Sequence, residues 1–136
     1  MRGLKFILVD DSAAFRRGLR DLLVSQYDAE IIAEASNSEE MYRIKNTRLA
    51  DVILMDVMMP GESGIELAKK LLWFVDNNLK IIAVTLHTEE VYLMTLIEAG
   101  FKGCIFKNEL TRQLSDALKS VMANRLYFPE NILLKR

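Results

Sequence analysis

The sequence is poor in cysteine and histidine, with one of each, and it contains only two prolines. The single cysteine, Cys104, cannot form an internal disulfide, and one cysteine with one histidine cannot make a zinc cluster. No apolar run approaches the roughly 18–20 residues needed to cross a bilayer. The formal net charge is only −1, so the chain has no global attraction to nucleic acid or to a membrane surface. We therefore expect no membrane partner.

The length and composition are those of one globular domain. The chain has 136 residues, of which 51% are hydrophobic and 27% charged, enough for a single sizeable core. Its first residues, MRGLKFILVDDS, contain a short apolar core followed at once by acids, which is not the pattern of a secretory signal peptide. We therefore expect the protein to be cytoplasmic.

Short apolar runs alternate with segments of helical periodicity along most of the chain. Runs such as KFILV indicate strands buried on both faces, whereas Phe15, Leu19 and Leu22 recur at helical spacing. This alternation predicts an α/β fold in which right-handed crossovers join parallel strands. We predict strands at 5–9, 30–35, 51–55, 80–84 and 103–106, and helices at 13–26, 38–47, 63 or 64 to 75, 88–99 and 110–124.

The alternation stops at Arg125. The remaining segment, RLYFPENILLKR, contains a proline and is too short for another unit of the sheet. We interpret 1–124 as one domain and 125–136 as the start of a linker.

Polar side chains follow four of the predicted strands. The acids Asp10 and Asp11 follow the first strand and Asp56 the third, while Thr85 follows the fourth and Lys107 the fifth. Because the carboxyl ends of parallel strands meet at one edge of the sheet, where α/β proteins bind ligands, these residues are expected to converge.

The expected cluster suits phosphoryl chemistry. Three neighbouring carboxylates repel one another unless a cation or proton intervenes, and an all-oxygen acidic site suits Mg²⁺. A lysine and a hydroxyl beside them would hold phosphoryl oxygens, and a carboxylate can itself attack phosphorus to form an acyl phosphate. Four of these residues also allow a plainer interpretation: Asp10 or Asp11 as a helix cap, Thr85 as a strand residue and Lys107 as a solvated lysine.

Four segments carry a resemblance to a known family, in matching order and spacing. They are ILVDDS, VILMDVMMPGESG, IIAVTLH and GCIFK. From residue 4 to about 124 the sequence resembles the receiver domain of a two-component response regulator. The resemblance implies a flavodoxin-like (βα)5 fold, a doubly wound five-stranded parallel sheet in the order 2-1-3-4-5.

The resemblance also implies a role for each residue of the cluster. Asp56 would accept a phosphoryl group from a sensor histidine kinase. Asp11, Asp56 and the backbone carbonyl of Met58 would bind Mg²⁺, and Asp10 would act through water. Thr85 and Lys107 would hold the phosphoryl oxygens. The domain would be regulatory rather than an enzyme, catalysing at most its own phosphorylation and dephosphorylation.

Finer details favour a subgroup. The TLH segment after the fourth strand, Asn108 in place of proline after Lys107, and the LYFPE ending are similar to receivers that precede LuxR-type helix-turn-helix domains. We therefore expect a transcriptional regulator that forms a homodimer on phosphorylation and contacts DNA only through an output domain absent from this chain. One departure is Cys104, which stands where such receivers usually carry an aromatic residue.

The sequence leaves three alternative functions to compare. A stand-alone receiver, acting in a phosphorelay or binding a protein partner without DNA output, fits the same site. A phosphatase with an aspartate nucleophile would want a second acid two residues after Asp56, where Met58 stands. A flavin or dinucleotide binder would need a glycine-rich loop after a strand, where VDDSAAF places acids instead. The last two are disfavoured.

Overall fold

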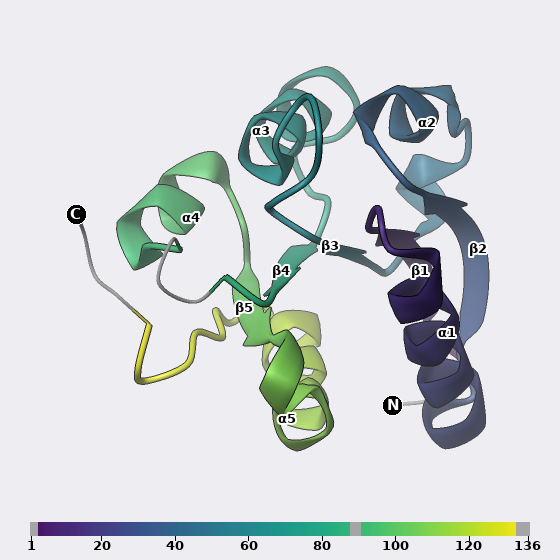
Figure 1. Ribbon diagram of the computed structural model, residues 1–136, viewed down its shortest axis with the longest axis vertical. Coiled ribbons are helices and arrows are strands. Elements are labelled where there is room, and N and C mark those ends of the chain that lie inside the picture. Colours follow the sequence, from purple (N-terminus) through teal and green to yellow (C-terminus); the bar gives the residue numbers. More distant parts are fainter. Residues whose placement is uncertain (1–2, 88–90, 133–136) are drawn as a thin grey trace.

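A computed structural model describes residues 3–87 and 91–132 of the protein. Five parallel strands form one sheet in the order β2-β1-β3-β4-β5, which confirms the predicted architecture and strand order (Figure 1). The strands are β1 (Lys5–Val9), β2 (Glu30–Ala35), β3 (Val52–Met55), β4 (Ile81–Thr85) and β5 (Gly103–Phe106). The helices are α1 (Ala13–Tyr27), α2 (Ser38–Arg43), α3 (Gly64–Phe74), α4 (Leu93–Ala99) and α5 (Leu110–Met122).

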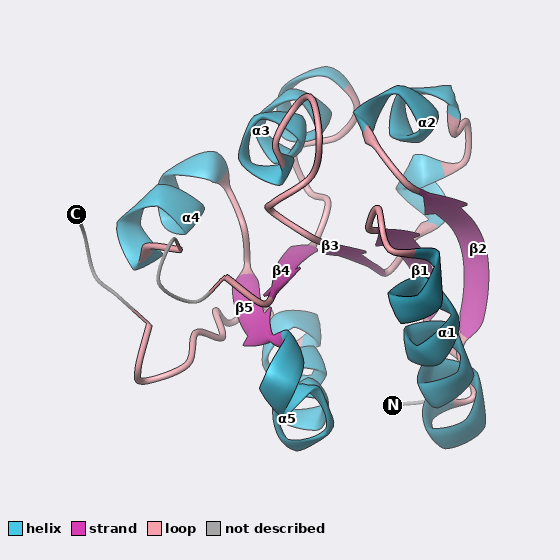
Figure 2. Cartoon of the chain, viewed as in Figure 1, coloured by secondary structure: helices cyan, strands magenta, loops and turns pink. Residues whose placement is uncertain are grey.

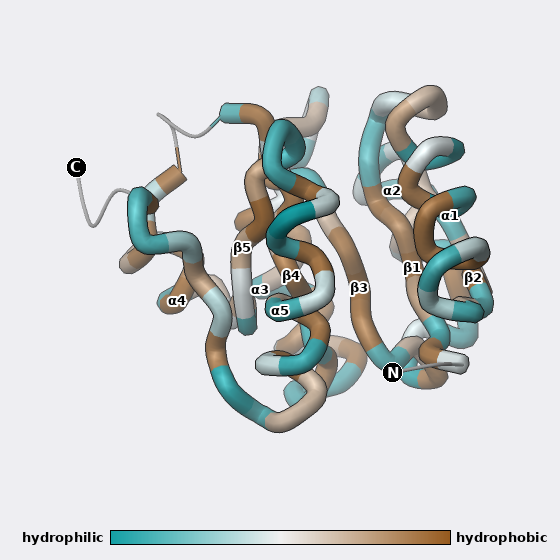
Figure 3. The backbone as a smooth tube through the Cα atoms, turned by 90° about the horizontal axis from the view of Figure 1, so that it is seen from below, coloured by the Kyte–Doolittle hydropathy of each residue, from teal (hydrophilic) through white to brown (hydrophobic). Residues whose placement is uncertain are grey.

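The helices cover both faces of the sheet (Figure 2). Alternate residues of β1 point to opposite faces, so Ile7 joins one apolar cluster and Phe6 the other. The cluster that contains Ile7 packs against α2, α3 and α4, and the cluster that contains Phe6 packs against α1 and α5. Strand β3 is apolar throughout and β4 is apolar up to its last residue, Thr85, as expected for strands that are buried on both faces (Figure 3).

Helices α3 and α5 end one and two residues before their predicted ends, and two other helices are shorter than predicted by at least four residues. The helix predicted at 38–47 ends at Arg43, because Ile44 has an extended backbone (φ −72°, ψ 123°), and a 3-10 turn follows at Thr47–Leu49. The helix predicted at 88–99 begins at Leu93. Tyr92 is extended, with φ −117° and ψ 134°, while residues 88–90 of that prediction lie outside the described residues.

The segment after α5 returns to the sheet. Tyr127 pairs with Gly103 at the edge of β5. The Tyr127 carbonyl accepts a hydrogen bond from the Cys104 N–H at 2.9 Å, and the Tyr127 N–H donates to the Lys102 carbonyl at 3.0 Å. Ile132 is buried against the apolar cluster that contains Ile7. Residues 125–132 thus pack on the domain, and their interpretation as the start of a linker stays a prediction.

None of the helices in the described part of the chain is both long enough and apolar enough to span a bilayer.

Candidate functional site

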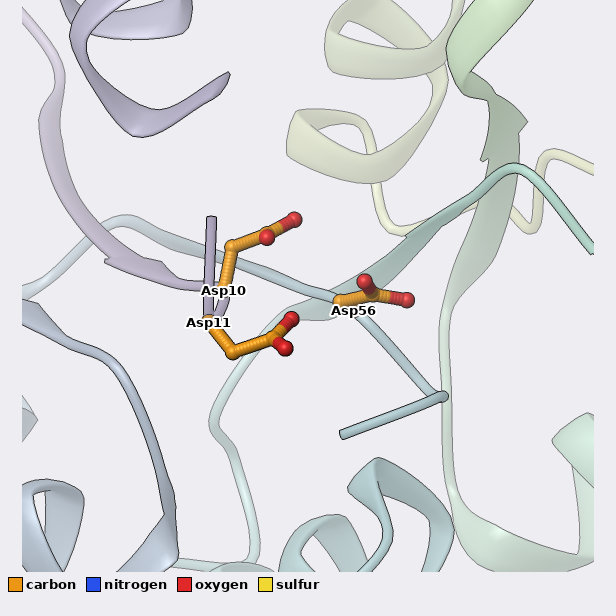
Figure 4. A group of neighbouring side chains, drawn as sticks. All are labelled: Asp10, Asp11 and Asp56. Atoms are coloured by element: carbon orange, nitrogen blue, oxygen red, sulfur yellow. The ribbon is translucent and has the colours of Figure 1, made fainter. Parts of the chain in front are cut away.

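The ends of two neighbouring strands bring the acids together. β1 pairs with β3 so that Val9 lies opposite Met55, and the Asp56 N–H donates to the Val9 carbonyl at 2.9 Å. Asp10 and Asp11 follow β1 directly, so their side chains lie beside Asp56 (Figure 4). One carboxylate oxygen from each of the three acids lies within 4.8 Å of the others. Asp10 and Asp56 are buried and Asp11 is exposed.

Lys107 reaches the same place from the end of β5. Its Nζ lies 2.7 Å from Asp10 Oδ2 and 3.1 Å from Asp56 Oδ2, and only 9% of its side chain is exposed. The contact with Asp56 is a hydrogen bond. The buried Asp10 Oδ2 accepts no hydrogen bond among the described residues, so the contact with Asp10 is an ion pair by distance only.

The remaining oxygens of the two buried aspartates bind backbone amides. Asp10 Oδ1 accepts a hydrogen bond from the Ser12 N–H at 2.9 Å, and Asp56 Oδ1 accepts one from the Met58 N–H at 3.1 Å. Each carboxylate therefore has one oxygen that fixes its own loop and one that faces Lys107. This division orients both side chains before any ligand arrives.

Burial and neighbouring charges have opposite effects on the pKa values of Asp56 and Lys107. Burial raises the pKa of Asp56 above its ordinary value, because it outweighs the Met58 N–H and the Lys107 charge, and Asp10 adds to the rise. Burial alone would lower the pKa of Lys107, but Asp10 and Asp56 outweigh it and hold that pKa above its ordinary value. Lys107 therefore stays protonated beside two acids.

Thr85 ends β4 at the same edge and is fully buried. Its hydroxyl oxygen accepts a hydrogen bond from the His87 N–H at 3.1 Å. A hydroxyl that accepts one bond can still donate its proton to a second partner. Thr85 thus lies at the end of the strand next to β3, and its role as a ligand for phosphoryl oxygens stays a prediction.

The acidic cluster fits a hard divalent cation. All the side-chain donors are carboxylate oxygens, and octahedral Mg²⁺ with ligands at about 2.0–2.1 Å requires ligand oxygens roughly 3–4 Å apart. The 4.8 Å limit on the three aspartate oxygens is close to that span. Met58 follows Asp56 by two residues, and the part of its backbone carbonyl in metal binding stays a prediction.

The sequence says different amounts about the surroundings of two further residues, Cys104 and Phe15. Cys104 lies in β5 with none of its surface exposed, and burial raises its pKa to about 12, so it behaves as a small buried apolar residue. Phe15 was predicted only as an apolar residue of the first helix. Its ring lies against Lys107, a contact that no sequence pattern signals.

Comparisons with known proteins indicate one family. The family model described as the response regulator receiver domain matches residues 6–119. Response regulator UvrY of Escherichia coli (strain K12) is 31% identical over 129 residues, which cover 95% of this chain and 59% of that protein. Transcriptional regulatory protein DesR of Bacillus subtilis (strain 168) is 30% identical over 93% of this chain and 63% of its own length. The chain therefore spans about three fifths of the length of these curated relatives.

Solved structures share the fold. A LuxR-family two-component response regulator from Aurantimonas sp. SI85-9A1 aligns with a TM-score of 0.85 at 28% identity, over 96% of this chain and 92% of that one. The isolated receiver domain of RcsB from Salmonella enterica serovar Typhimurium aligns with a TM-score of 0.81 at 23% identity, over 96% of both chains.

Proposed function

The chain belongs to the response regulator receiver domain family, and from that premise we propose that Asp56 is its phosphoacceptor. The observation that carries the proposal is the pair of contacts from Lys107 Nζ, 3.1 Å to Asp56 Oδ2 and 2.7 Å to Asp10 Oδ2. A buried lysine that faces two acids can exchange one of these contacts for a phosphoryl oxygen when that group is attached to Asp56.

The transfer that we propose is an in-line displacement. One carboxylate oxygen of Asp56 forms a bond to phosphorus while the bond from phosphorus to the donor breaks, and the donor keeps the electron pair of that bond. Lys107 and the Thr85 hydroxyl would then donate to the phosphoryl oxygens. The Met58 N–H, which already binds Asp56 Oδ1, keeps the carboxylate oriented.

The metal that we propose is Mg²⁺, held by Asp11, Asp56 and the Met58 carbonyl, with Asp10 acting through water. When bound, the ion offsets negative charge on the phosphoryl oxygens during transfer. The all-oxygen donor set and the exposure of Asp11, which leaves room for metal-bound water, support this assignment.

The test is the intact mass of the protein after incubation with acetyl phosphate and Mg²⁺. We expect one added phosphoryl group on the wild type and none on Asp56→Asn, which keeps the shape but removes the nucleophile. Asp21→Asn, at an exposed position of α1, is the matched control and should be labelled like the wild type. Labelling of Asp56→Asn, or its absence in the wild type, would contradict the proposal.

We also propose the setting in which this switch acts. The phosphodonor would be a sensor histidine kinase in the cytoplasm, and the receiver would control a DNA-binding output domain by dimerising when phosphorylated. The name of one relative, transcriptional regulatory protein DesR, supports the output. The gene sequence beyond Arg136 distinguishes this proposal from a stand-alone receiver. Sedimentation with and without a beryllofluoride mimic tests dimerisation, and an unchanged monomer fraction would count against it.

A further inference from the structure

The ammonium group of Lys107 has an aromatic neighbour as well as its two acids. Its Nζ lies over the ring of Phe15, 4.2 Å from the ring centroid. A cation at this distance from an aromatic face is attracted by the ring quadrupole, and the attraction grows when the pair is shielded from water. With only 9% of the Lys107 side chain exposed, this contact is largely shielded.

The helix start that carries Phe15 is held in place by the same aspartate that pairs with the lysine. Asp10 Oδ1 accepts a hydrogen bond from the Ser12 N–H at 2.9 Å. The Ser12 hydroxyl caps α1 by accepting a hydrogen bond from the Phe15 N–H at 3.1 Å. Asp10 Oδ2 then meets Lys107 Nζ at 2.7 Å. These contacts form a closed ring of four residues, Asp10, Ser12, Phe15 and Lys107. Through them the start of α1 positions Phe15 beside the ammonium group of Lys107.

We propose that Phe15 is a positioning residue that holds Lys107 over the site where the phosphoryl group attaches. The inference rests on the proposed phosphorylation of Asp56. Lysine is a point charge on a flexible four-carbon stem, so its head needs guidance to meet one small group. The contact with Asp56 must change when that carboxylate becomes an acyl phosphate. The contact with Phe15 involves no charge on the ring and does not have to change, so it keeps the ammonium group at the site throughout.

A plain packing role for Phe15 makes different predictions. The residue is half-buried and also packs against the apolar cluster that contains Phe6, so removing its ring costs packing as well as the cation contact. Leu22 packs against the same cluster from the same face of α1, about 10 Å further along the helix by its rise. Leu22→Ala therefore serves as a matched control that loses packing without touching Lys107.

The first experiment follows the rate of labelling by acetyl phosphate with Mg²⁺ present. Phe15→Leu keeps an apolar side chain but removes the ring, and we expect labelling about three- to tenfold slower. Phe15→Tyr keeps the aromatic face and should label at the wild-type rate, as should Leu22→Ala. In a Lys107→Ala background, Phe15→Leu should have no further effect, because a residue that acts through Lys107 cannot act without it. Equal rates for Phe15→Leu and wild type, or equal slowing by Leu22→Ala, would overturn the positioning role.

The second experiment does not depend on phosphorylation. The ring should shift the NMR signals of the Lys107 methylene protons next to Nζ upfield, and the shift should vanish in Phe15→Leu and persist in Phe15→Tyr. Absence of the shift in the wild type would overturn the inference. A wild type that shows the shift but takes no label would instead overturn the proposed phosphorylation. Urea unfolding of each variant verifies that the comparisons are made between folded proteins.

Discussion

Replacing Gly64 with alanine should disturb both the stability of the domain and the position of Asp56. Gly64 is the first residue of α3, and its N–H donates to the Val57 carbonyl at 3.0 Å, which closes the connection from β3. A Cβ atom at Gly64 would lie 2.3 Å from the Asp56 carbonyl oxygen and 2.8 Å from the Val57 Cα. Both neighbours are backbone atoms, so the clash can be relieved only by moving backbone, either the loop that carries Asp56 or the start of α3.

The size of the effect follows from the nature of the clash. Overpacking in a well-packed site typically costs about 1–3 kcal/mol, and a clash with backbone should fall in the upper half of that range. For a chain of this length, about 2–3 kcal/mol corresponds to a melting temperature lowered by roughly 10 °C. Displacement of the Asp56 backbone should also slow labelling by acetyl phosphate.

Gly18 provides the matched control. It lies inside α1, and a Cβ there would meet nothing within 4 Å. Gly18→Ala should therefore stabilise the protein by about 0.5–1 kcal/mol, because alanine loses less backbone entropy in a helix. The assay is urea unfolding of both variants, followed by the time course of labelling. A Gly64→Ala protein as stable and as quickly labelled as the wild type would refute the argument from close approach.

Three other predictions concern the acids and their neighbours. Since burial raises the pKa of Asp56 in the folded state, its contribution to stability is present below the unfolded pKa and is lost as pH rises through the folded one. Asp56→Asn should therefore be more stable than wild type towards urea at neutral pH, with the gap closing towards about pH 4. Mg²⁺ at a hundredfold excess over its dissociation constant should stabilise the wild type by about 2.7 kcal/mol. The Asp11→Asn variant should lose most of that gain in the same urea assay. An equal gain in stability for the variant and the wild type would exclude Asp11 as a ligand. Met58, 40% exposed beside Asp56, has only a weak acceptor with which to orient water. Met58→Asn should therefore speed decay of the acyl phosphate by roughly tenfold, or about 1.4 kcal/mol of barrier, and equal decay rates would leave Met58 as packing alone.

The parts of the fold that were predicted correctly are those whose local sequence pattern fits only one secondary structure. The predicted bounds of β1, β2 and β5 are those observed, because each is a short run rich in apolar residues with polar residues or glycine at its ends. The helix ends were harder to predict because burial does not require a helix. Ile44 packs against the apolar cluster from an extended backbone, and Val91 is buried just before α4 begins. An apolar residue at helical spacing looks the same in the sequence whether the helix continues or not.

The candidate site was predictable to the extent that topology determines it. Parallel strands end at one edge, so Asp10, Asp56 and Lys107 could be expected to meet from their positions after β1, β3 and β5, and they do. What the sequence could not supply is the division of each carboxylate between a backbone amide and the lysine, or the ring of Phe15 beneath Nζ. Those depend on the orientation of side chains across elements that no local pattern relates.

Strand β5, which ends directly before Lys107, also binds the segment after α5. Lys107 comes directly after β5, and within that strand the Cys104 N–H binds the Tyr127 carbonyl at 2.9 Å. The fit is close, because a Cβ on Gly103 would lie 2.7 Å from the same carbonyl oxygen. Cys104 is small and fully buried, so it has no ring whose rotation could relay a change at the site. The backbone hydrogen bonds at Tyr127 therefore give a change in the position of β5 a direct route to residues 125–132, beside the apolar contact of Ile132 with the cluster that contains Ile7.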